Sequence, residues 1–388
     1  MNVARRRVVL APPLLALAAL SAPAPSLSAR ATSADVVTVQ AVRVHPPPRT
    51  FSVAATGDVI TESAVNVTAA AAAAPGERFD YTSIFAPVAP VLRGADLAIC
   101  HMEIPIGVPG ARPGVYGRSP FGGNLVLAPF EIAAGLRGAG FDRCSTASNH
   151  SNDLGPAGIT STLDALDAVG LSHNGTARTP SEAVVNTFVV NGVRIAHLSY
   201  TRYSNTTSPE PWRMSDATSV AQVATDVDQA RAGGAEVVIL SIHISQEMLP
   251  APTPADRAFI TAVTAAARVD LVIEHGPHVV QPLERVNGTW VFWSVGNFVT
   301  GMGWNQTGRY SDQRTMDGLI AWVRFTESTS EPGRFLADAT PALICNERVS
   351  RVVRPVVPTL ADPSISADLR SQMQLCLARS AAVVADLR

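Results

Sequence analysis

The feature of this sequence that most constrains its fold is the alternation of short apolar runs with segments of helical spacing. The apolar runs predict strands over 50–55, 95–100, 141–146, 184–190, 193–200, 236–242, 269–273 and 289–294, the last being the final core strand we expect. Apolar residues at helical spacing, together with a helix-prone alanine run, predict helices over 69–74 or 82–92, and over 132–139, 158–169, 217–232 and 256–267. Strands that alternate with helices predict an α/β fold with much parallel sheet.

Polar residues able to bind a metal follow these predicted strands directly. They are Asp58, His101, Glu103, Asn149, His150, His243, His275 and His278. Because ligands in open α/β sheets collect beyond the carboxyl ends of the strands, we expect these side chains at one sheet edge. Imidazole, carboxylate and carboxamide ligands together suit Zn, Mn or Fe. The sequence therefore predicts one or two divalent metal ions, and two ions about 4 Å apart would activate a water for in-line displacement.

His150 is the candidate catalytic residue of this group. It directly follows Asn149, so that a metal-binding Asn149 would direct His150 into the same cleft as a general acid. Asp153 is placed to bind the other ring nitrogen of His150.

The same residues occur in an order that resembles a known family. The series is Gly57-Asp58, His101-Met102-Glu103, Asn149-His150, His243, His275-Gly276-Pro277-His278 and Ser294-Val295-Gly296-Asn297-Phe298. It resembles the CapA family of capsule or poly-γ-glutamate synthesis proteins, related to the calcineurin-like metallophosphoesterases, over about residues 50–300. The resemblance implies a four-layer αββα sandwich with a metal site at one sheet edge. It also implies metal ligation by Asp58, Glu103, Asn149, His243, His275 and His278, and catalysis by His150.

Two positions depart from the family pattern, and a third departs from a motif of the wider superfamily. His101 stands where the family usually has asparagine, and we expect it to be an extra metal ligand or a base opposite His150, the alternative being a bond to a neighbouring backbone carbonyl. Glu274 replaces a common glycine and is a candidate extra base or substrate contact. Ile60 stands at the histidine position of the wider superfamily's Asp-x-His motif, which makes a mononuclear site an alternative.

The leading functional hypothesis is an exported metal-dependent hydrolase that cleaves a phosphoester or amide bond in poly-γ-glutamate or another anionic envelope polymer. Arg112 and Arg118, in a Gly/Pro-rich loop, are candidate contacts for that anionic substrate, or else part of a solvated surface loop. Asn297 is a candidate substrate contact, or a turn residue. Two alternatives remain open: a non-catalytic assembly or export factor, and a metal-dependent epimerase acting at a peptide α-carbon through a His/Glu pair. The partners expected are an anionic polymer or peptide substrate and membrane-associated capsule machinery.

The N-terminal segment predicts export. Arg5 to Arg7 precede an apolar run and an Ala-x-Ala cleavage site at 29–31, which is the layout of a signal peptide over 1–31, the alternative being an uncleaved anchor. A Pro-rich linker over 32–49 leads to the main domain over 50–327 and a C-terminal extension over 328–388. We therefore expect a secreted or cell-surface protein.

The four cysteines allow three disulfide connectivities. In an oxidising compartment we favour Cys345–Cys376, because both lie in the same terminal segment. Cys100 and Cys144 would pair if their strands are neighbours, and would otherwise be buried thiols.

The charge composition excludes two function classes. The formal net charge is −2, which is not typical of a nucleic-acid-binding groove. All 30 basic residues are arginine, so chemistry that depends on a lysine amine is excluded.

Overall fold

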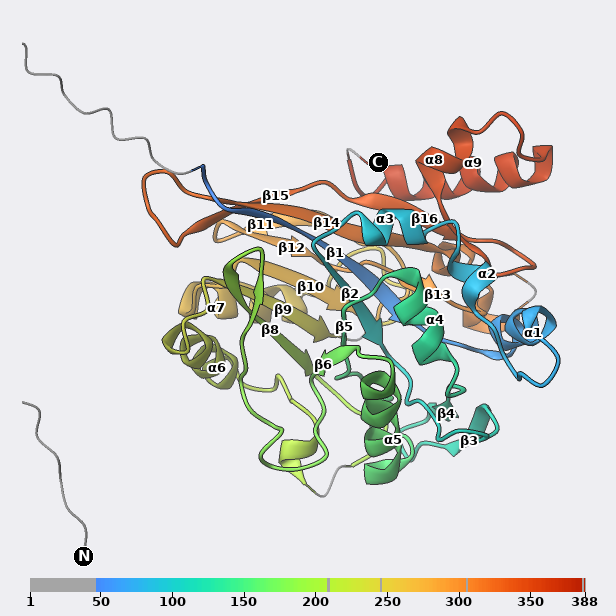
Figure 1. Ribbon diagram of the computed structural model, residues 1–388, viewed down its shortest axis with the longest axis horizontal. Helices are drawn as coiled ribbons and strands as arrows, with labels where there is room; N and C mark the ends of the chain where they lie inside the picture. The colour runs from blue at the N-terminus through green and yellow to red at the C-terminus, as the bar shows by residue number, and fades with distance from the viewer. Residues whose placement is uncertain (1–46, 208–209, 245, 305, 386, 388) are drawn as a thin grey trace, which may run out of the picture. The chain divides into compact units, whose positions relative to one another are not determined.

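Two β-sheets pack face to face in the computed structural model, which describes residues 47–388 except 208–209, 245, 305, 386 and 388 (Figure 1). The larger sheet runs in the order β17 (Val353–Pro355), β16 (Ala342–Asn346), β14 (Asp317–Glu327), β1 (Thr50–Val59), β2 (Leu97–Met102), β5 (Arg143–Ser145) and β6 (Ser172–Asn174), with β13 (Asn297–Val299) beside β1 and β15 (Phe335–Ala339) beside β14. The second sheet runs in the order β11 (Leu283–Val286), β12 (Thr289–Phe292), β10 (Leu271–His275), β9 (Val237–His243), β8 (Val193–Thr201) and β7 (Phe188–Val190). A separate hairpin consists of β3 (Gly114–Arg118) and β4 (Asn124–Leu127).

Helices cover the outer face of each sheet. The helices against the larger sheet are α1 (Ser63–Ala72), α2 (Thr82–Phe85), α3 (Ala89–Arg93), α4 (Ile132–Ala139) and α5 (Gly155–Ala168). Those against the second sheet are α6 (Val220–Ala232) and α7 (Pro254–Ala266). Near the C-terminus, α8 (Val356–Ala361) and α9 (Ala367–Ala381) pack against β16. Short 3-10 turns occupy Pro211–Arg213, Gly308–Ser311 and Gln313–Met316.

The alternation of side chains along each strand creates the layers. Val53 of β1 and Ile239 of β9 belong to one apolar cluster between the sheets. Their neighbours Ala54 and Leu240 belong to two other clusters, shared with the helices outside each sheet. Because successive strand residues point to opposite faces, each central strand is apolar on both sides. The predicted four-layer αββα arrangement is therefore confirmed.

The parallel strands end at the edge where the polar residues lie. β1, β2, β5 and β6 are parallel neighbours in one sheet, as are β8, β9, β10 and β12 in the other. A hairpin turn at Asn191-Gly192 joins β7 and β8, and both turn residues have positive φ, as this dipeptide favours.

A β-bulge at the end of β1 aims Asp58 between the sheets. The register with β2 shifts between Ala55 and Asp58, and the faces exchange: Ala55 lies in the inter-sheet cluster, whereas Val59 lies in the outer one. Gly57 makes this possible, because a Cβ there would lie 1.8 Å from the Gly296 carbonyl oxygen. The backbone N–H of Asp58 donates to that same oxygen at 3.1 Å.

The expectation that the core strands end at Ser294 is wrong. β14 follows it in the chain and pairs antiparallel with β1 over seven residues, from Thr50–Thr326 to Thr56–Ile320. Its apolar residues Leu319, Ala321 and Val323 line the inter-sheet core. Residues 328–388 contribute β15, β16 and β17 to the same sheet, so the larger sheet extends through the C-terminal part of the chain.

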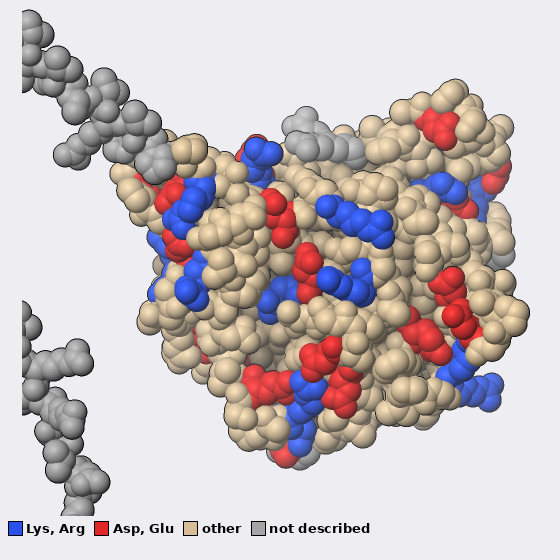
Figure 2. All heavy atoms as spheres, viewed as in Figure 1, with Lys and Arg blue, Asp and Glu red and all other residues tan. Residues whose placement is uncertain are grey.

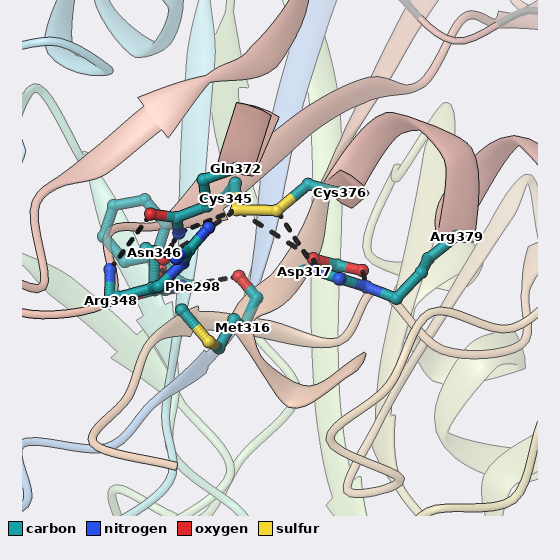
Figure 3. Close-up of a disulfide and its surroundings, with 9 residues drawn as sticks. All are labelled: Phe298, Met316, Asp317, Cys345, Asn346, Arg348, Gln372, Cys376 and Arg379. Atoms are coloured by element: carbon teal, nitrogen blue, oxygen red, sulfur yellow. Dashed lines mark hydrogen bonds and ion pairs between the residues drawn. A yellow bond between two sulfur atoms is a disulfide. The ribbon is translucent and has the colours of Figure 1, made fainter. Parts of the chain in front are cut away.

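The two disulfides are Cys100–Cys144 and Cys345–Cys376, with Cα separations of 4.4 and 6.3 Å. Cys100 and Cys144 face each other on the neighbouring strands β2 and β5. Cys345 on β16 forms a disulfide with Cys376 on α9. The ion pair between Asp317 and Arg379 lies beside it (Figure 3). Both pairings considered from the sequence are thus present.

The disulfides indicate an extracytoplasmic location. The segment over 1–31 with the signal-peptide pattern, and nearly all of the linker, lie outside the described residues. Within the described ranges, no helix is both long and apolar enough to span a bilayer.

Loss of the Cys345–Cys376 disulfide should destabilise the fold. Replacing both cysteines with alanine opens a loop whose ends are 31 residues apart, and loop-closure entropy predicts a loss of about 3–4 kcal/mol in the free energy of unfolding. Urea denaturation followed by circular dichroism measures this loss. Mass spectrometry should show Cys100–Cys144 still oxidised in the same variant. An unchanged unfolding free energy would contradict the assignment of α9 as a disulfide-anchored part of the fold.

Candidate metal centre

Donor residues from both sheets meet at the carboxyl ends of the strands. His101 on β2, His243 on β9 and His275 on β10 each lie two or four positions after a residue of the inter-sheet cluster. Because strand residues an even number of positions apart share a face, these three histidines are on the inter-sheet face. Asp58 joins them from β1, opposite His101 in the strand register. Each of these four side chains is buried, with at most 2% of its surface exposed.

The first donor group consists of Asp58, Glu103 and His278. Asp58 Oδ2 lies 3.0 Å from His278 Nδ1, and Glu103 Oε1 lies 3.8 Å from His278 Nε2. One ligand atom from each residue lies within 4.8 Å of the others, close enough for one cation to contact all three. His278 has a positive φ of 58° and follows Gly276 and Pro277 in a tight turn after β10.

The second donor group consists of Asp58, His101 and His243, again with ligand atoms within 4.8 Å of one another. His101 Nε2 lies 3.1 Å from His243 Nδ1 and 3.9 Å from Asp58 Oδ1. His275 completes the surroundings: its Nδ1 is 3.6 Å from Asp58 Oδ1, and its ring stacks on His101 at 4.0 Å. Asp58 therefore belongs to both groups, as an acid that bridges two cations would.

The donor atoms fit a metal because many of them are otherwise unsatisfied. Among the described residues, no hydrogen-bond partner reaches Asp58 Oδ1, Glu103 Oε2, Asn149 Oδ1, His243 Nε2 or either ring nitrogen of His275. Buried polar atoms are normally paired, and an exception needs an explanation such as an ion. A mixed N/O donor set of this kind suits Zn, Mn or Fe.

The donors act on one another's charges. Burial opposes the charge of His278, but Glu103 and Asp58 raise its pKa to about 10. Burial opposes the charge of Asp58, but its contacts with His275 and His278 hold its pKa well below the usual range. Burial raises the pKa of Glu103 well above its usual value. Burial lowers the pKa of His243 to about 3 and that of His101 well below its usual value, so both rings are neutral and able to bind a metal.

His150 is held by the loop that follows β5. Its Nδ1 lies 2.6 Å from Asp153 Oδ2, which accepts the ring proton, and 3.0 Å from the Asn205 side-chain nitrogen. Asp153 is itself fixed by the backbone N–H of Val126. Ser151 Oγ donates to the Thr146 carbonyl oxygen at 2.6 Å and tightens the turn. His150 is among the residues that line the cavity beside the donors.

A cavity of about 670 Å³ opens beside the donors. Glu103, Asn149, His150 and His278 lie at its metal end. Its walls come from α1, from the β3–β4 hairpin and from the segment around Met302 and Tyr310. The volume is in the range of small-molecule sites.

Four residues expected at the site lie elsewhere or play a different part. Glu274 is buried but sits between the inward residues Ile273 and His275, so strand alternation directs it toward the α7 side. Burial there raises the pKa of Glu274 well above its usual value. Arg112 and Arg118 are exposed on the hairpin segment and do not line the cavity within the described residues. Asn297 is fully buried, and its Oδ1 lies 3.0 Å from His278 Nδ1, so it positions a donor.

Sequence reasoning missed Ser145 and Asn205. Ser145 Oγ lies 2.7 Å from His101 Nδ1 and orients that ring. Asn205 contacts His150 and also Asn149, whose Nδ2 lies 3.4 Å from Asn205 Oδ1. Asn205 follows β8 of the second sheet, and nothing in its local sequence signals this long-range contact.

A third group of potential ligands, Asp317 with Cys345 and Cys376, has a different explanation. Its two sulfur atoms form the disulfide, and Arg379 pairs with the carboxylate at 2.7 and 2.8 Å. It is a structural cluster.

Two CapA proteins from Bacillus species are similar to this chain in sequence. The chain is 26% identical over 237 residues to the capsule biosynthesis protein CapA of Bacillus anthracis, a match that covers 59% of this chain and 56% of that protein. It is 28% identical over 284 residues to the PGA biosynthesis protein CapA of Bacillus subtilis, covering 67% of each. The match thus spans little more than half the length of the first relative.

Solved structures with a similar fold include the calcineurin-like phosphoesterase YfkN of Bacillus subtilis, with a TM-score of 0.43, 12% identity, and coverage of 87% of this chain and 98% of that one. The NAD nucleotidase NadN of Haemophilus influenzae gives a TM-score of 0.42 with 13% identity, covering 87% and 64%. The sequence profile of the bacterial capsule synthesis protein PGA_cap matches residues 52–302, which is more than half of the chain and includes every donor residue described above. This chain therefore belongs to the PGA_cap family of bacterial capsule synthesis proteins.

Proposed function

We propose that this chain is an exported metal-dependent hydrolase that cleaves a phosphoester or amide bond during assembly of a cell-envelope polymer. The observation that carries the proposal is Asp58: a fully buried carboxylate shared by two donor groups beside a cavity that His150 lines. The relatives are named for capsule and PGA biosynthesis, which supports a polymer of the cell envelope as the setting. Export is supported by the two disulfides.

The cations would be held by two sets of residues that share Asp58. Glu103, His278 and the unpartnered Oδ1 of Asn149 would complete one set, and His101, His243 and His275 the other. Bound divalent metal would supply Lewis acidity, activating a water and stabilising negative charge on the substrate. In the Asp-x-His motif of the wider superfamily, the histidine position is occupied here by Ile60, an apolar residue that lines the cavity. His101 would provide the ligand that this position lacks.

His150 would protonate the leaving group. Asp153 accepts the Nδ1 proton, which fixes the tautomer and stabilises the protonated ring, as the third member of a catalytic triad does. The other ring nitrogen, Nε2, would carry the proton, since His150 lines the cavity together with Glu103 and His278. A proton held there can pass to an oxygen or nitrogen leaving group.

Metal content tests the donor assignment. After reconstitution with Mn²⁺, Zn²⁺ or Fe²⁺, the purified chain should hold at least one equivalent, and Asp58→Asn should lose most of it because both donor groups share that carboxylate. Inductively coupled plasma mass spectrometry measures the content. His173→Ala is the matched control, since His173 pairs with Asp167 away from the donors. A wild-type chain that holds far less than one equivalent would count heavily against catalysis.

Removal of His150 tests the hydrolase proposal. His150→Ala should lower kcat by about 10²–10⁴-fold while the metal content stays unchanged, because a general acid contributes in this range. Bis(p-nitrophenyl) phosphate and γ-glutamyl p-nitroanilide are probes of the two bond types. An assembly factor that uses the site only to hold polymer would instead keep its function in this variant.

His101→Asn tests the second donor group. The substitution restores the usual family residue, and we expect it to lower the metal stoichiometry and to alter the pH–rate profile, because His101 lies 3.1 Å from His243 and 3.9 Å from Asp58. Ser145→Ala is the comparison variant, since it keeps the imidazole and removes the hydrogen bond that orients it, together with one to the Cys100 carbonyl oxygen. Full metal content with an unchanged pH–rate profile would show that His101 has no special role.

A further inference from the structure

A further cavity, of about 610 Å³, opens where β6, at the edge of the larger sheet, lies beside β8 of the second sheet. Its described walls come from these two strands, from α6, from the end of α5, from parts of the segment over 175–186 and from Trp212 and Ser215. None of these lining residues also lines the cavity beside the donors, so the two cavities are distinct. The volume is sufficient for a small-molecule ligand.

Hydroxyl and amide side chains are the largest group in the lining of this cavity. Of the nineteen described lining residues, eight carry a hydroxyl or an amide, six are apolar, four are Asp, Glu or His, and one is glycine. Apolar residues are thus a minority, and the cavity suits a polar ligand better than an apolar one.

The charges in the lining do not favour an anion. Asp167 and Glu182 both pair with Arg178, which also pairs with Asp164. Burial lowers the pKa of His173, so its ring is neutral at pH 7. No arginine is among the described lining residues, and on the face of the molecule in Figure 2 the described basic and acidic side chains are interspersed, without an extended basic patch. A polymer with a carboxylate on every unit would therefore meet carboxylates, and no cation, in the described wall.

Three side chains of α6 form a polar stripe along the cavity. Gln222, Asp226 and Gln229 are spaced i, i+4 and i+7, so they lie on one face of the helix and extend over about 10 Å of its axis. Asp226 accepts from the Tyr200 hydroxyl at 2.8 Å and from the Gln222 side-chain amide at 2.9 Å, so its carboxylate is stabilised without a cation. The side-chain amide of Gln229 has no partner among the described residues and is available to a ligand.

Aromatic surface lies in the same cavity. Trp212 and Tyr200 both line it, and Trp212 is half-buried. The Arg213 guanidinium lies 4.3 Å from the centre of the Trp212 ring and covers one face of that ring. Aromatic rings beside hydrogen-bonding groups suit a ligand that has an apolar face and polar edges. A sugar ring is such a ligand, because its C–H groups form a face and its hydroxyls project from the rim.

We infer that this cavity binds a neutral oligosaccharide, whose hydroxyls bond to the α6 stripe and one of whose rings packs on Trp212. Each sugar hydroxyl both donates and accepts, as the side-chain amides of Gln222 and Gln229 do, and it can also donate to Asp226. The length of the stripe is comparable with that of a disaccharide. This binding goes beyond the proposed hydrolysis, because it gives the chain a separate site for recognition of a glycan.

Isothermal titration of the full chain compares trimeric probes of different charge. Cellotriose and N,N′,N″-triacetylchitotriose are neutral, the triuronic acid form of cellotriose is anionic, and triserine amide is a peptide with hydroxyls and one ammonium group. We expect at least one neutral trisaccharide to bind with a Kd of about 1 mM or below, about tenfold or more tighter than the anionic trisaccharide or the peptide. Because cations bound at the donors also attract carboxylates, binding is assigned to this cavity only where Trp212→Ala weakens it.

Two variants with matched controls place the sugar in the cavity. Trp212→Ala should weaken binding of the neutral trisaccharide by about tenfold or more, because it removes the ring surface. Trp304→Ala is its control, since that half-buried ring also lies beneath an arginine, Arg348, and is not part of the lining. Gln229→Ala should weaken binding by about threefold or more. Thr225→Ala, at an exposed position of the same helix outside the lining, should leave it unchanged.

The inference is overturned if neither neutral trisaccharide binds, or if Trp212→Ala and Gln229→Ala both leave its binding unchanged. It is also overturned if the anionic trisaccharide or triserine amide binds at this cavity as tightly as the neutral trisaccharides, since the site would then recognise an anion or a peptide.

Discussion

The structure depends on one buried carboxylate. Asp58 is fully buried between two sheets, and an isolated charge in such a place is very costly. It is stabilised by histidines that come from both sheets: His101 from β2, and His275 and His278 from the end of β10. The two sheets must therefore pack in one register for the charge to be satisfied. The same requirement creates a site in which a buried carboxylate and several imidazoles converge.

The C-terminal part of the chain supports this site from behind. Asn346 follows Cys345 and donates to the carbonyl oxygens of Phe298 and Met316, while its own carbonyl oxygen accepts from Gln372 of α9 (Figure 3). Asn297, next to Phe298, donates to the Thr315 carbonyl oxygen and contacts His278. A continuous set of hydrogen bonds thus runs from the disulfide-anchored helix to a donor of the candidate metal centre. Residues 328–388 are part of what positions the site.

Family membership does not specify which ligand fits the cavity beside the donors. Capsule synthesis names the setting of the relatives, whereas the walls of the cavity determine which groups fit beside the donors. Apolar residues such as Val67 and Val115 and polar residues such as Asn149 line that cavity in about equal numbers. The two exposed arginines of the hairpin segment, Arg112 and Arg118, remain outside the cavity lining that the structure describes.

The sequence by itself predicted an α/β fold and most of the residues that meet at the candidate metal centre, whereas the four layers were implied by the resemblance of its motifs to a family. Helix 132–139 was predicted to the residue, and the strands that carry His101, His243 and His275 were predicted to within a few positions, because local periodicity encodes which faces are buried. It did not indicate β14, whose pairing with β1 joins residues more than 260 positions apart. Nor did it indicate the bulge that turns Asp58 inward, the contact of Asn205 with His150, or the outward direction of Glu274. Only the tertiary structure decided these, because each depends on strand register and on close approach between segments remote in sequence, which local pattern does not specify.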